Sequence, residues 1–97
     1  MLPGDLFILR NESAEPMRLT VVAAERIVWQ GDLRAGGVQI AFSDIDRETD
    51  VTVTCATPGT APVTVRGNYM MGGVPPQIAT IRLPSCAKAD IWVEMLP

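Results

Sequence analysis

The chain has 97 residues, of which 47% are hydrophobic and 20% charged, and its formal net charge is −3. This length suits one hydrophobic core, so we expect a single domain over residues 1–97, and the apolar content excludes a disordered chain. The acidic balance argues against nucleic acid as a partner, because phosphate binding needs clustered Lys and Arg. No apolar run approaches the roughly 20 residues that span a bilayer, so we expect no membrane segment.

Turn-forming residues recur about every ten residues, which is typical of a β-sandwich or barrel. The segments between them are rich in Val, Ile, Thr and aromatic residues, which favour strands. In chain order, the expected strands cover residues 5–10, 17–24, 27–32, 38–43, 49–57, 62–70, 77–83 and 90–95. We therefore predict an all-β fold, a single antiparallel two-sheet sandwich of seven or eight strands with little or no helix.

Apolar and polar residues alternate along several of these segments, and this period of two assigns side chains to the core or to solvent. The residues expected to face the core are Val38, Ile40 and Phe42, Val51, Val53 and Cys55, Val63, Val65 and Tyr69, and Ile91, Val93 and Met95. Trp92 and Leu96 then project outward from the last strand. Glu25 and Arg26 leave room only for a tight hairpin, and the only candidate helical turn is the acidic segment 43–49.

Three segments carry a resemblance to known proteins. Trp-Gln-Gly-Asp-Leu-Arg-Ala-Gly-Gly at 29–37, Asn-Glu-Ser at 11–13 and Gly-Asn-Tyr-Met at 67–70 resemble a set of small bacterial β-sandwich proteins of immunoglobulin-like or prealbumin-like type. The resemblance implies a sandwich and no particular activity. Residues 52–55 are also similar to the disulfide strand of an immunoglobulin domain, but such a domain has its core Trp between its two cysteines, whereas here Trp29 precedes both and Trp92 follows both.

Catalytic patterns are missing from the sequence. There is no histidine, which excludes Ser-His-Asp and Cys-His arrangements within this chain. Ser13, Ser43 and Ser85 have neither a GxSxG context nor a nearby lysine, so we assign them to turns and strand ends. We expect a protein that is not an enzyme and that uses no cofactor.

An acidic segment is the one candidate metal site. Its carboxylates occupy alternate positions, namely Asp44, Asp46, Glu48 and Asp50. Calcium prefers such oxygen clusters, but a calcium loop that starts at Asp44 needs Gly at its sixth position and Glu at its twelfth, where this chain has Thr49 and Cys55. We expect a solvated acidic loop, with a calcium- or carbohydrate-binding module as the alternative.

The two cysteines, Cys55 and Cys86, lack CxxC spacing, and there is no histidine to complete a zinc site. A disulfide between them and two separate thiols are both compatible with the sequence. The N-terminus has no basic flank followed by a long apolar segment. We therefore expect a cytoplasmic protein, with a periplasmic or virion-associated location as the alternative.

Methionine and tryptophan are favoured at adaptable protein contacts. The candidate binding residues are Met70, Met71, Val74, Trp92 and Leu96. We predict a non-enzymatic interaction module of bacterial or phage origin, which binds a protein partner or a second copy of itself through a sheet edge, the loop 70–76 or the C-terminal strand. The alternative from the same class is a phage virion component or a small acidic inhibitor of a host nucleic-acid-binding system.

Overall fold

Segments rich in β-branched residues form eight strands in the computed structural model, which describes residues 4–72 and 76–95. Every expected strand is present, with both ends within one residue of the predicted position. The strands are β1 (Asp5–Asn11), β2 (Met17–Ala23), β3 (Arg26–Leu33), β4 (Val38–Ser43), β5 (Thr49–Ala56), β6 (Val63–Met70), β7 (Gln77–Leu83) and β8 (Asp90–Met95). No helix forms within the described ranges, and 43–49 contains no helical turn.

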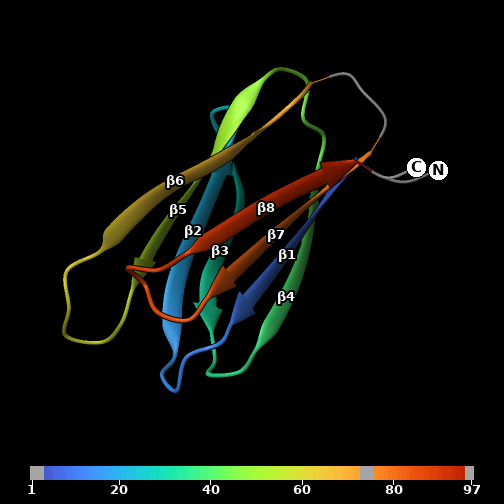
Figure 1. The fold of residues 1–97 in the computed structure, drawn as a ribbon. Helices are drawn as coiled ribbons and strands as arrows, with labels where there is room; N and C mark the ends of the chain where they lie inside the picture. Colours follow the sequence, from blue (N-terminus) through green and yellow to red (C-terminus); the bar gives the residue numbers. More distant parts are fainter. Residues whose placement is uncertain (1–3, 73–75, 96–97) are drawn as a thin grey trace.

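The strands form two four-stranded sheets, ordered β4-β1-β7-β8 and β3-β2-β5-β6, and these make the two layers of a sandwich (Figure 1). The prediction of a fully antiparallel fold was wrong for one pair, because β1 runs parallel to β7. These two strands are far apart in sequence, so no tight turn sets their relative direction. All other paired strands are antiparallel.

The core lies between the sheets and is filled from both layers. Its fully buried members include Phe7 and Leu9 of β1, Leu19 of β2 and Ile81 of β7. The inward assignment of Val51, Val53 and Cys55 on β5 is confirmed, since all three are buried.

The predicted orientation of β4 was wrong. Val38, Ile40 and Phe42 are 51%, 53% and 48% exposed, whereas Gln39, Ala41 and Ser43 face the core side and are partly buried. The alternation was identified correctly, but the pattern alone does not say which face is buried. The register with β1 decides it, because Ile8 and Ile40 are paired on the outer face and Phe7 and Ala41 on the inner one.

The predicted orientation of β6 was wrong at Tyr69. Val63 and Val65 share the inner face with their partners Cys55 and Val53, as predicted, but Tyr69 is 55% exposed and Met70 is fully buried. The cause is a β-bulge, since Asp50 pairs with Tyr69 while Val51 pairs with Gly67, which leaves Asn68 as an extra residue. An extra residue reverses the alternation beyond it.

A two-residue turn connects β2 to β3. Its residues are Ala24 and Glu25, one position before the predicted Glu25-Arg26 turn, and both have positive φ, 53° and 61°. Positive φ at both central positions is the geometry that suits the twist of a two-residue hairpin. The Ala24 N–H donates to Thr49 Oγ1 over 2.7 Å, which attaches this hairpin to the start of β5.

A disulfide joins Cys55 of β5 to Cys86, which follows β7 in the other sheet, with the two Cα atoms 5.2 Å apart. It closes a sequence separation of 31 residues. The pairing that the sequence left open is therefore present, and it connects the two layers of the sandwich.

Candidate protein-interaction groove

A groove with a volume of about 340 Å³ lies between β6 and β8, where the two sheets meet at one side of the sandwich. The lining residues are Asn68, Tyr69, Met71, Gln77, Trp92, Val93, Glu94 and Met95. Four of these are large apolar side chains with about half of their surface exposed, and Trp92, at 60%, is the most exposed of them. The groove therefore gathers solvent-exposed apolar groups from both sheets.

The bulge in β6 supplies one wall. Because the alternation reverses at Asn68, Tyr69 turns outward into the groove while Met70 enters the core. Met70 was predicted to be a binding residue, but its side chain is buried and cannot contact a partner at the groove. Met71, the next residue, was predicted to be a binding residue, and its side chain is exposed at the groove.

Gln77 holds the segment that carries Met71. Its Nε2 donates to the Met71 carbonyl over 2.6 Å, and its Oε1 accepts from the Met71 N–H over 3.2 Å. The side chain is almost wholly buried, and the Gln77 N–H donates to the carboxylate of the buried Asp5 over 2.8 Å. Buried hydrogen bonds of this kind give Met71 a defined position at the groove, even though it lies outside the strands.

The other wall is β8, an edge strand of its sheet. An edge strand offers backbone N–H and C=O groups that are free to pair with an added strand. The outward direction expected for Trp92 is confirmed, and Val93 packs partly against the core, but Met95 is exposed at the groove although it was expected in the core. Val74 and Leu96 lie outside the described residues.

Gly67 and Asn68 close one end of the groove. A Cβ on Gly67 would lie 2.5 Å from Ile91 Cδ1, so the absence of a side chain lets β6 approach β8 here. Asn68 Nδ2 donates to the Ile91 carbonyl over 2.8 Å, which links the two sheets by a side chain.

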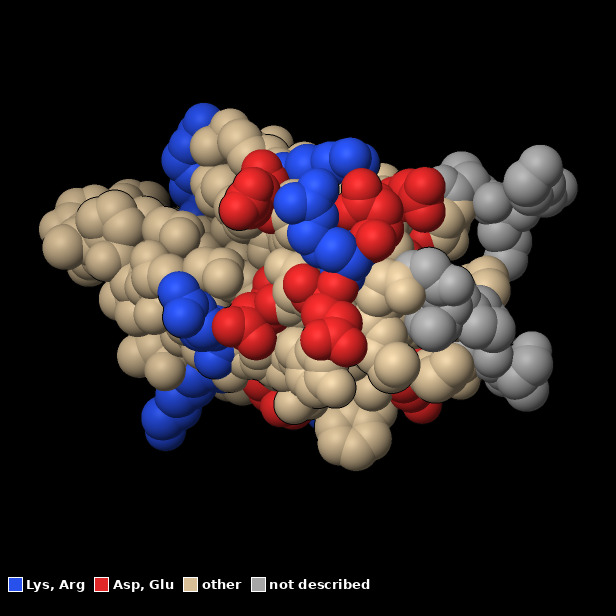
Figure 2. Space-filling model, turned by 90° about the horizontal axis from the view of Figure 1, so that it is seen from above, with Lys and Arg blue, Asp and Glu red and all other residues tan. Residues whose placement is uncertain are grey.

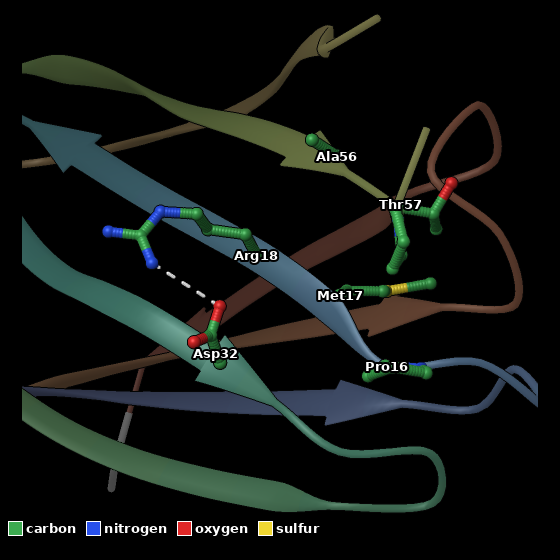
Figure 3. A pocket seen from close by; sticks show the side chains of 7 residues that line it. Pro16, Met17, Arg18, Asp32, Ala56 and Thr57 are labelled. Carbon is green, nitrogen blue, oxygen red and sulfur yellow. Dashed lines mark hydrogen bonds and ion pairs between the residues drawn. The ribbon is translucent and has the colours of Figure 1, made fainter. Parts of the chain in front are cut away.

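A larger groove, of about 470 Å³, lies where β2 begins, beside β3 and β5 (Figure 3). Arg18 and Asp32 point toward each other there and form an ion pair at 3.3 Å. Both charges are well exposed, so this pair contributes little energy. None of the exposed large apolar side chains of the described chain lines this groove, so it offers a weaker anchor for a partner.

The four carboxylates of the acidic segment do not gather around one point. Within residues 4–72 and 76–95, no group of three or more potential metal ligands lies close together. Asp46 instead contacts Arg47 Nε at 3.2 Å and Arg26 at 3.4 Å, and Asp50 contacts Arg66 at 3.8 Å. The hydrogen bond from Arg47, with the positive charge of Arg26 nearby, lowers the pKa of Asp46. Two of the four carboxylates, those of Asp46 and Asp50, are thus paired with arginine.

Basic side chains do not form an uninterrupted patch on the face seen in Figure 2. Lys and Arg lie beside Asp and Glu across the centre of that view. Alternating signs of this kind reduce the attraction of a phosphate backbone. No helix in the described part of the chain is long and apolar enough to cross a membrane.

No protein-family model matches the sequence, and no curated protein matches it. The groove therefore has to be interpreted from its own chemistry. Sequence reasoning missed Tyr69 and Met95, which it assigned to the core. Gly67 was the available signal for Tyr69, because glycine inside a strand often marks a bulge.

Proposed function

We propose that this chain is a non-enzymatic protein-interaction module that binds a protein partner through the groove between β6 and β8. The observation that supports this most directly is the exposure of Tyr69, Met71, Trp92 and Met95 around one hollow. Tyrosine and tryptophan are enriched among the residues that anchor protein interfaces, and methionine adapts its shape to a partner surface.

The edge strand beside the groove suggests the mode of binding. A segment of the partner that extends along β8 would gain backbone hydrogen bonds from the strand and apolar contacts from the groove. Among the described residues that line the hollow, Glu94 is the one that carries a charge. A basic side chain in the partner segment would complement it.

The disulfide bears on where the protein works. Disulfides persist in oxidising compartments and are rare in the cytosol, where thiols are kept reduced. Cys55 is buried, and its bond to Cys86 spans the two sheets. We favour a periplasmic or virion-associated location over the cytoplasmic one expected from the sequence.

The test is affinity capture with immobilised wild-type protein and three variants. Met71→Asp and Trp92→Ala alter the groove. Ile27→Ala is the control, because it removes an apolar side chain that is 60% exposed, like Trp92, from β3, at the opposite edge of its sheet from β6. We expect a partner retained by wild type and by Ile27→Ala to be weakened roughly tenfold or more by each groove variant. Retention of the same partner by Met71→Asp and Trp92→Ala at wild-type affinity would reject the groove as the binding site.

A further inference from the structure

The outer face of the β4-β1-β7-β8 sheet is apolar, although it faces away from the core. Val38, Ile40 and Phe42 are each about half exposed on β4, and Leu6 and Ile8 lie beside them on β1. The strand registers continue this face across the sheet, to Ile78 and Thr80 on β7 and then to Trp92 on β8. The apolar surface thus runs along two neighbouring rows of the face, through Phe42, Leu6 and Ile78 and through Ile40, Ile8 and Trp92, and the charged residues of the face lie around it.

The orientation of β4 is held by hydrogen bonds at both ends. Before the strand, the Asn11 N–H donates to the Gly37 carbonyl over 2.9 Å. After the strand, the Ile45 N–H donates to the carboxylate of the buried Asp5 over 3.1 Å, and Ile45 itself is buried. A shift of one residue would bury the apolar side of β4, and these contacts oppose that shift. The apolar side is therefore held toward solvent by the fold.

An exposed apolar surface of a few hundred Å² with a polar margin often marks an interaction site. A face of four strands and six residues extends over roughly 20 Å in each direction, given the spacing of strands and the rise per residue. Two such faces in contact, with their uneven side-chain surfaces taken into account, bury a total of on the order of 1,000 Å² over both copies. This total is about the lower bound for a specific interface. The β-branched side chains of β1 and β4 suit the interdigitation of packed sheets.

The charges at the margin of the face fit a second copy. Arg10 and Arg82 lie at one end of the inner strands, while Asp90 and Glu94 lie on β8. Arg82 is also bonded to Glu12, 2.9 Å from its carboxylate. A two-fold interface brings one surface onto itself, so a margin of a single sign would repel its copy. Both signs are present here, and they nearly balance.

We propose that the chain forms a homodimer in which the outer faces of two β4-β1-β7-β8 sheets pack together. This surface is distinct from the β6 side of the groove, and the residues that border both are Trp92 and Glu94 of β8. The partner proposed for the groove and the second copy proposed for the sheet face can therefore be tested with different residues.

The test is the mass of the full, disulfide-bonded chain in sedimentation equilibrium, from low micromolar to near-millimolar concentration. We expect wild type to associate into a dimer of its 10.5 kDa chain. Ile40→Glu should raise the dissociation constant roughly a hundredfold or more, because an unpaired charge would be buried. Val38→Lys introduces the opposite charge and should also weaken the dimer. The matched control is Ile27→Glu on β3 of the other sheet, which should leave the dimer intact.

Melting curves will show that each variant is folded, which is expected since the replaced side chains are exposed. The proposal is rejected if wild type is monomeric throughout the range, or if Ile40→Glu and Val38→Lys associate like wild type. It is also rejected if Ile27→Glu dissociates the dimer equally, or if the face binds vesicles of zwitterionic lipid and the protein stays monomeric. Met71→Asp should remain dimeric, which separates this proposal from that of the groove.

Discussion

Gly67 and Ile91 are in direct contact across the two sheets, so closely that a Cβ on the glycine would lie 2.6 Å from the Cβ of the isoleucine. The contact brings β6 against β8 at one end of the proposed groove. Both strands are at the edges of their sheets, and this point joins them.

Replacement of this glycine tests the contact. Gly67→Ala should destabilise the fold by about 1–3 kcal/mol, because the added methyl group must displace Ile91 or push β6 away. Urea unfolding at equilibrium measures the loss. In the Ile91→Ala background the same substitution should cost less, and strictly additive effects would show that the two residues do not compete for space.

The disulfide should contribute strongly to stability. Loss of the bond in the double variant Cys55→Ala/Cys86→Ala should cost about 3–4 kcal/mol, as expected for a closed loop of this length. Thermal melts with and without a reductant provide the measurement. The reductant should lower the melting temperature of wild type and leave the variant unchanged, so equal melting of oxidised and reduced wild type would contradict the prediction.

The β2–β3 turn can be improved. Glu25 has a φ of 61°, which strains any residue with a Cβ, so Glu25→Gly should stabilise the protein by about 0.5–1 kcal/mol. Loss of its exposed ion pair with Arg47, at 3.9 Å, offsets little of this gain. Glu25→Ala removes the same carboxylate and keeps the Cβ, so it should bring no gain. A melting temperature that rises equally in both variants would assign the effect to charge instead of backbone strain.

Acid should weaken the pairing of Asp46 with Arg47. The folded state lowers the pKa of Asp46 below its ordinary value of 3.8, chiefly through the hydrogen bond from Arg47. A carboxylate with a lowered folded pKa stabilises the protein above the unfolded pKa, and the contribution disappears as pH falls through the folded value. We expect Arg47→Ala to raise the pKa of Asp46, as measured by NMR titration of its carboxyl carbon. An unchanged titration midpoint would refute the assignment.

The positions of the strands could be read from the sequence because turn residues and β-branched runs act locally. Which face of each strand is buried was harder to predict. Ile40 and Phe42 follow the same alternation as Val51 and Val53, yet the first pair faces solvent and the second faces the core. Alternation defines two sides of a strand, and only the pairing with neighbouring strands selects the buried one.

The groove was partly predictable. Trp92 and Met71 were identified from residue type, and both are exposed at the hollow. Met70 and Tyr69 exchanged the expected sides because one bulge residue, Asn68, reversed the order. The hollow itself brings together strands from different sheets, and such long-range proximity has no local signal in a single sequence.

The parallel pairing of β1 with β7 also has a consequence for how the chain acquires its structure. The Gln77 N–H donates a hydrogen bond to the Asp5 carboxylate, and these two residues are 72 positions apart in the sequence. During synthesis β1 emerges first, and its neighbours β4 and β7 follow only later. Contacts of such long sequence separation slow folding, because the loop entropy is lost before the contacts form. We expect the first strand to complete its sheet only after nearly the whole chain has left the ribosome.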